Sequence, residues 1–336
     1  MKKFFSSLLI ISLSFSLVAC SEPQIDEDAQ TVINNAWLKL ADKNASYETG
    51  IIDIDGSIDI DFDSTSIELS GDGKLTFDSS DPKNVKTILD IDVDGNGTLE
   101  GQNGGISLEG EFRTLKEKLF VFLKSLSIET DDPQASFMAN LVEGAFKDQW
   151  YAIPVPENDL IPSDESLLST KNFKGKEAAE IAKKHNFFDL KEETGYRTYS
   201  LTVNPDKLKG YINAVSQLNG TETTAEDLAA VDALLLTSEY SIEVTINSEY
   251  DITWLKTDLM ANDPENNQKV TLNFKGSFEN DESDGDLTIK TEGEVPGTLK
   301  ISFDTEHNMN TSVNITEPEG AQDFDPAQML GLGGGL

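Results

Sequence analysis

The chain has 336 residues and holds 61 Asp and Glu against 26 Lys and Arg, which gives a formal net charge of −35 at pH 7. Because phosphate contacts need cationic side chains, this charge excludes nucleic acid as a partner, and it argues against lying flat on an anionic membrane. The acidity fits either solubility in a saline or cation-rich exterior or the steering of cationic ligands.

The first residues have the pattern of an export signal. Lys2 and Lys3 precede an apolar stretch from Leu8 to Val18, which is too short for a membrane span and ends at Leu17-Val18-Ala19-Cys20. This ending resembles a bacterial lipoprotein signal, which implies removal of residues 1–19 and diacylglycerol on Cys20. The alternative is an ordinary secretory signal with a chance cysteine.

The position of Cys20 favours the lipoprotein interpretation, because it is the single cysteine of the chain and stands where the lipid chemistry requires it. The mature chain then has no disulfide. We expect an envelope protein held outside the cytoplasmic membrane by its acyl chains, at the outer membrane or the cell surface according to the envelope. By the family rule, Ser21 after the cysteine leans towards the outer membrane.

A tether and a helix follow the signal. Residues 20–27 are predicted to be the lipidated cysteine and a polar tether. Residues 28–43 have helical spacing, with Asp26 or Asp28 as the N-cap and Lys39 and Lys43 near the C-terminus. One apolar stripe runs along this helix: Val32, Ile33, Ala36, Trp37 and Leu40.

After Tyr47 the apolar residues alternate, which predicts strands with one buried and one wet face. The first strand alternates aspartates with Ile52, Ile54, Ile58, Ile60 and Phe62. We expect Gly56–Ser57 to break its register, and further strands at 65–77, 86–93 and 106–113. The expected turns lie at 80–82, 94–97 and 102–105. Residues 118–123 are apolar on both faces, so we expect this strand to be covered on both sides.

The second half mixes helices and strands. Helices are predicted at 133–147, 174–185, 205–218 (with Asn204 as cap) and 225–235. The predicted strands are 196–203, 238–247, 251–261, 268–278, 286–292, 297–304 and 309–316. Residues 28–320 are expected to form a single domain, and 321–336 a flexible Gly-rich tail.

The segment Leu89-Asp90-Ile91-Asp92-Val93-Asp94-Gly95 raises the question of a calcium loop. Such a loop needs an acidic residue at position 12, but position 12 from Asp90 is Gly101, and Glu100 is one place short. The alternation of neighbouring segments favours a strand that runs into a turn. We therefore expect no built metal site, and only weak divalent cation binding to an acidic face.

Catalytic motifs are missing from the sequence. His185 and His307 are its only histidines, and it has no G-x-S-x-G elbow, P-loop or H-E-x-x-H motif. With Cys20 assigned to lipid, zinc would lack its nitrogen and sulfur ligands. We expect neither an enzyme nor a cofactor.

The order of elements resembles the lipoprotein-carrier superfamily, with its LolA-like and LppX/LprG-like proteins. The matching segments span most of residues 28–320: Ala36–Ala41, Ala45–Tyr47, Leu119–Phe122, Asp148–Tyr151, Gly195–Val203, Asp206–Leu208 and Val313–Pro318. The resemblance implies an α+β fold, a large curved antiparallel half-barrel wrapped around the N-terminal helix and further short helices. It also implies a concave apolar side that holds acyl chains. The chain departs from the family in its acidity and in extra helical stretches around 160–186 and 220–236.

Two functions follow from this interpretation. The first is an envelope protein that binds or carries a lipid or other amphiphile in a cavity of the half-barrel. The second is a surface lipoprotein with a packed core that acts as an acidic protein-interaction scaffold. The candidate ligand-lining residues, for which ordinary core packing is the alternative, are Trp37, Leu40, Ile58, Ile60, Phe62, Phe120 and Phe122.

Overall fold

The computed structural model describes residues 27–63, 65–81, 84–99, 102–115, 118–130, 133–154, 175–218, 220–263, 268–279, 281–293 and 296–324. The predicted signal, Cys20, almost all of the tether and the end of the tail lie outside these residues. The chain divides into two compact units. Unit 1 holds the residues up to 47 and 174–307, and unit 2 holds 48–173 and 308–336. The single domain expected over 28–320 stays a prediction.

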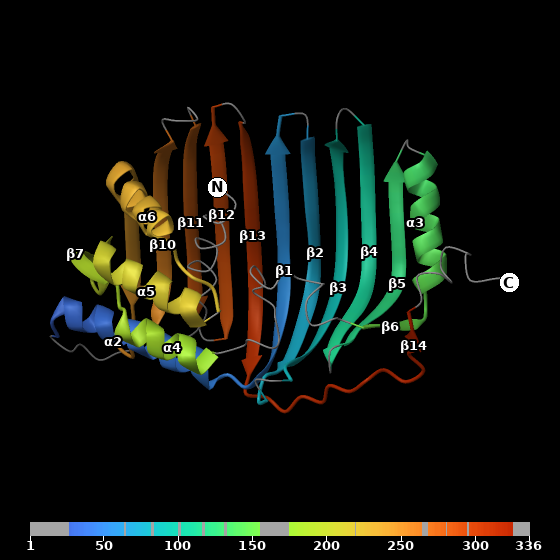
Figure 1. Cartoon of the computed structure of the whole chain (residues 1–336), viewed down its shortest axis with the longest axis horizontal. Helices are drawn as coiled ribbons and strands as arrows, with labels where there is room; N and C mark the ends of the chain where they lie inside the picture. The colour runs from blue at the N-terminus through green and yellow to red at the C-terminus, as the bar shows by residue number, and fades with distance from the viewer. Residues whose placement is uncertain are drawn as a thin grey trace. The chain divides into compact units, whose positions relative to one another are not determined.

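Unit 1 is an antiparallel sheet with helices on it (Figure 1). Its strands are β7 (Phe188–Gly195), β8 (Thr198–Val203), β9 (Glu239–Ile246), β10 (Ile252–Asp263), β11 (Gln268–Glu279), β12 (Glu282–Glu292) and β13 (Gly297–Met309). Each strand neighbours the next one along the chain. The helices are α2 (Ala29–Ser46), α4 (Gly175–Lys184), α5 (Pro205–Leu218) and α6 (Ala225–Thr237).

The core of unit 1 lies between these helices and the sheet. Trp37 of α2 packs edge-on against Phe187 and Phe188, with ring centroids 5.2 and 5.3 Å away. The same cluster holds side chains from the sheet, such as Phe274, which is 5% exposed, and Leu287, which is 7% exposed. The helices of unit 1 therefore supply one side of its core, and the sheet supplies the other.

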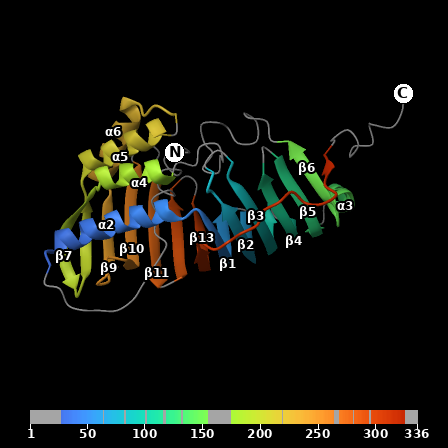
Figure 2. The same cartoon turned by 90° about the horizontal axis from the view of Figure 1, so that it is seen from below.

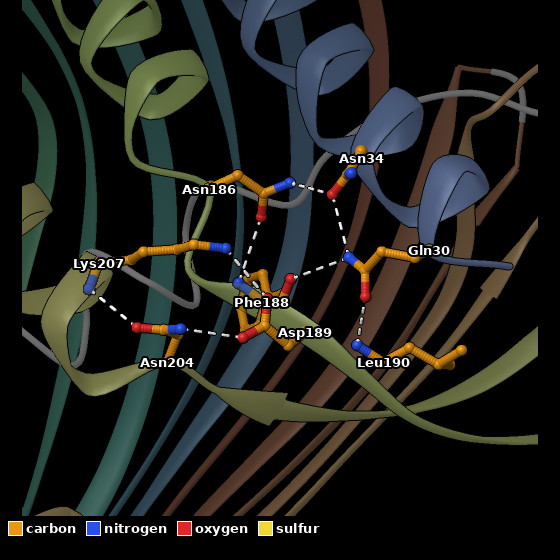
Figure 3. A network of polar contacts seen from close by, with 8 residues as sticks. All are labelled: Gln30, Asn34, Asn186, Phe188, Asp189, Leu190, Asn204 and Lys207. Carbon is orange, nitrogen blue, oxygen red and sulfur yellow. Dashed lines mark hydrogen bonds and ion pairs between the residues drawn. The ribbon is translucent and has the colours of Figure 1, made fainter.

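Polar side chains attach α2 to the edge strand β7 (Figure 3). The Gln30 side chain accepts a hydrogen bond from Leu190 N at 2.7 Å and donates one to Phe188 O at 3.4 Å. Asn186 bonds to Asn34 at 2.9 Å. Because an unpaired strand edge can recruit other chains, Gln30 also blocks part of the edge of this sheet.

Unit 2 consists mainly of long β-hairpins. Its strands are β1 (Thr49–Phe62), β2 (Thr65–Asp78), β3 (Lys86–Leu99), β4 (Gln102–Leu115), β5 (Lys118–Thr130), β6 (Trp150–Pro154) and the short β14 (Gln322–Asp323). β1 to β6 pair antiparallel in chain order, and β14 pairs parallel with β6. The single helix described in this unit, α3 (Pro133–Phe146), packs on β5. The predicted α+β class, with mostly antiparallel β-structure and short helices, is confirmed.

β5 is covered on both faces, as its sequence predicts. Val121 and Leu123 pack with Phe146 of α3. Phe120, on the other face, packs with Leu115, Ala152 and Ile315, the last of which belongs to the segment that leads from β13 to β14 (Figure 2).

Several local predictions are wrong. Residues 94–97 and 102–105 form no turn, because β3 continues to Leu99 and β4 begins at Gln102. The register is unbroken at Gly56, which pairs with Gly71. β13 ends at Met309, so 309–316 is not a strand, whereas β7 was not predicted. Polar, exposed residues in the second half of β7 hide its alternation.

Candidate functional site

The two faces of the sheet in unit 2 differ sharply in chemistry. Along β1 the even-numbered residues share a face, and the registers continue that face through odd-numbered residues of β2 and β3 and even-numbered residues of β4. We call it the apolar face, and its large side chains are Ile52, Ile54, Ile58, Ile60, Phe62, Ile67, Leu69, Leu75, Phe77, Leu89, Ile91, Val93, Ile106, Leu108 and Phe112.

The apolar face is only partly covered. Its large side chains on β1–β4 are half-buried, and Ile106 is 38% exposed. Of the described helices α3 alone packs on this sheet, at β5. The sheet of unit 1, by contrast, includes core side chains only a few per cent exposed, such as Phe274 and Leu287, beside partly buried ones such as Leu272 and Ile301. Unit 2 thus leaves a continuous aliphatic surface on four strands.

Glycines on the apolar face let neighbouring strands approach closely. A Cβ on Gly71 would meet the backbone oxygen of Asp92, and a Cβ on Gly97 would meet that of Ser66. Both positions therefore need glycine inside a strand. For this reason the segment Asp94–Gly97 has the composition of a turn although it continues β3.

The opposite face, here the acidic face, carries the carboxylates of the same strands. They are Asp53, Asp55, Asp59, Asp61, Glu68, Asp72, Asp78, Asp90, Asp92, Asp94, Glu109 and Glu111. Burial and the nearby Glu111 raise the pKa of Asp90. Within the described part of the chain, no group of three or more His, Cys, Asp or Glu side chains is arranged to hold a metal ion.

A hollow of about 730 Å³ opens on the acidic face near the Phe62 end of β1. Its lining is mainly polar and includes Asp59, Glu68, Asp94 and Glu129. None of the predicted ligand-lining residues contributes to it. This hollow is therefore not the apolar cavity that the sequence suggests.

The predicted lining residues fall in three places. Trp37 and Leu40 belong to the core of unit 1, where the Trp37 indole Nε1 donates to Ala182 O at 2.6 Å. Ile58, Ile60 and Phe62 lie together on the apolar face of unit 2.

Phe120 and Phe122 lie on the other face of β5, where Phe122 packs on Trp150 at 5.1 Å. Sequence reasoning missed the contributions of β2, β3 and β4 to the apolar face, such as Leu69, Val93 and Leu108. Their alternation was visible, but only the strand registers show that they share one face with Ile58.

Two large apolar side chains of α3 are exposed: Phe137 is 61% exposed and Leu141 is 45% exposed. No helix in the described ranges has the length and apolar character that a bilayer span requires.

Comparison with known proteins assigns the chain to no family. No protein-family model and no curated protein sequence matches the chain. Among solved structures, the chain is similar to a DUF1329 family protein from Desulfovibrio piger, with 10% identity over 86% of this chain and 96% of that one, at a TM-score of 0.27. A TM-score this low does not establish a common fold.

Proposed function

We propose that the protein is a lipid-anchored envelope protein that binds a lipid or another hydrophobic ligand on the apolar face of unit 2. The observation that carries the proposal is that none of the described large side chains of the apolar face on β1–β4 is fully buried, whereas the helices of unit 1 cover a buried core. Soluble proteins rarely expose a contiguous apolar patch larger than a few hundred Å², and such patches mark binding surfaces. A bound ligand would remove this surface from water.

The chemistry of the apolar face favours acyl chains. Its side chains are mostly Ile, Leu and Val, with aromatic rings only at Phe62, Phe77 and Phe112. Flexible hydrocarbon chains can fill the shallow grooves between such side chains without any directional contact. The anchor rests on the sequence around Cys20, and membrane attachment would place the protein beside a source of such ligands.

The second candidate function is an acidic scaffold that binds a protein partner. The acidic face and its polar hollow favour it. In that case the apolar face would stay without a small ligand.

Native mass spectrometry separates the two. The chain from residue 20 with Cys20→Ser keeps every residue that the structure describes. It would be exported in a bacterial host behind a cleavable secretory signal, and its mass would be measured before and after solvent extraction. The proposal predicts a stoichiometric extra mass that extraction removes and that lipid analysis identifies. An apo mass that stays unchanged when lipids are offered would contradict it and favour the scaffold.

A further inference from the structure

We infer that the ligand of the apolar face is an amphiphile with an uncharged, hydrogen-bonding head, and not an anionic lipid. This inference rests on the proposed function and deepens it by naming the ligand class. The observation behind it is the distribution of charged side chains over the two faces of β1–β5.

The apolar face offers no charge to a ligand. From β1 through β5, the described positions on this face hold aliphatic, aromatic, glycine, threonine or glutamine residues, while every Asp, Glu, Lys and Arg of these strands points to the other face. An anionic head lying on this face would lose water without gaining a cationic partner, which is costly.

The cations that the structure describes in unit 2 are already engaged in ion pairs. Each Lys or Arg described in this unit is ion-paired with a carboxylate at 2.5 to 3.2 Å: Lys74 with Asp53, Lys86 with Asp78, Arg113 with Glu111, Lys118 with Asp323, Lys124 with Glu109 and Lys147 with Glu143. Recognition of a phosphate or carboxylate head needs a cation to face it. In unit 2, an anionic head would have to compete with these carboxylates.

Several of the described positions at the ends of the apolar face are polar and uncharged. Thr65, Gln102 and Thr130 stand at one end of the strands, and Thr87 and Thr114 at the other. The Oγ1 atoms of Thr87 and Thr114 lie 2.8 Å apart. Hydroxyl and amide groups both donate and accept hydrogen bonds, so they suit a hydroxyl- or amide-bearing head.

The test compares two ligands with matched chains, monodecanoylglycerol and decyl sulfate, each below its critical micelle concentration. Calorimetry on the Cys20→Ser chain would give both dissociation constants. We expect the neutral ligand to bind about tenfold tighter or more, because the acidic chain repels the sulfate. Added salt should reduce the difference between the two dissociation constants, because it screens that repulsion.

Two variants locate the head. Gln102→Lys adds a cation at the exposed end of the apolar face, and Asn103→Lys adds the same charge at the next, also exposed, position on the acidic face. We expect Gln102→Lys to raise the affinity for decyl sulfate several-fold more than Asn103→Lys does.

The outcomes separate the two proposals. Equal or tighter binding of decyl sulfate to the unaltered face would overturn the inference and leave the proposed function standing. An equal gain in affinity for decyl sulfate from both lysine variants would also overturn the inference, because it would place the head of the ligand away from the apolar face. Binding of neither ligand would overturn the proposed function as well.

Discussion

His307 is a buried titratable group held by two hydroxyls. Its Nε2 lies 3.0 Å from Ser283 Oγ and 2.9 Å from Thr305 Oγ1, and its Nδ1 has no hydrogen-bond partner. Burial lowers the pKa of this imidazole below its ordinary value of 6.5, although the nearby Asp281 opposes the shift and Lys43 adds to it. The folded chain therefore binds fewer protons here than the unfolded chain does.

The free energy of unfolding should consequently fall as the pH drops from 7 through 6.5 towards the lowered pKa of His307. Denaturant melts at a series of pH values would measure this fall. In His307→Gln, which keeps a polar side chain but cannot titrate, the curve should be flatter over the same range. Parallel curves for the two proteins would mean that His307 does not govern the pH dependence.

Gly71 is required by the closeness of two strands. A Cβ at this position would meet Asp92 O and lie 2.9 Å from Val93 Cα, so Gly71→Ala should destabilise unit 2 by about 2 kcal/mol. Gly73→Ala is the matched control on the same strand and face, because its Cβ would lie 3.3 Å from Asp90 O and 3.8 Å from Ile91 Cγ2. Thermal unfolding of both variants tests this, and an equal loss in both would refute the steric explanation.

At the scale of elements, α2 is a structural helix of unit 1. Asp28 caps it by accepting from Thr31 N at 3.1 Å, and Trp37 anchors it through ring contacts and the bond to Ala182 O. Trp37→Phe keeps an aromatic ring but loses that bond, and should cost about 1–3 kcal/mol. Ligand binding by unit 2 should be unchanged.

The control for this variant is Leu38→Ala, because Leu38 is 37% exposed on the same helix and should matter less to stability. Chemical denaturation and ligand titration of both variants are the measurements. If Trp37→Phe weakened ligand binding while leaving stability intact, Trp37 would line the ligand site, as the sequence suggested.

Most elements could be predicted because their periodicity is strong. The sequence shows the apolar stripe of α2, the N-cap of α5 at Asn204 and the alternation of β1–β4. The structure has these elements where the patterns predict them. The turn wrongly predicted at residues 94–97 has a physical cause. Gly95 and Gly97 have the composition of a turn, but their lack of a Cβ serves the approach of β2 inside a continuing strand.

The candidate site was only partly predictable. Alternation shows that Ile58 and Ile60 share a face, and this was predicted. Whether Val93 or Phe120 lies on that face depends on hairpin register and on the irregularity between Glu109 and Gly110, which no local pattern reveals. Burial of Trp37 likewise depends on Phe187 and Phe188, far along the chain.

At the scale of the whole molecule, the chain combines a very acidic composition with a proposed lipid anchor. Cys20→Ser should abolish incorporation of labelled palmitate, because one cysteine would hold all the acyl chains. Ser21→Ala should leave the labelling unchanged. Continued labelling of the Cys20→Ser protein would refute the anchor.

The central claim is that the apolar face of unit 2 binds the ligand, and β3 offers the most direct test because its residues alternate between the two faces. Ile91→Thr with Val93→Thr makes the apolar face polar with little change in side-chain shape, while Asp92→Asn with Asp94→Asn alters the acidic face of the same strand. Calorimetric titration with monodecanoylglycerol, after thermal unfolding has shown each variant folded, is the measurement. We predict about a tenfold loss of affinity for the threonine pair and none for the asparagine pair. Unchanged binding by the threonine pair, or an equal loss in the asparagine pair, would contradict the claim.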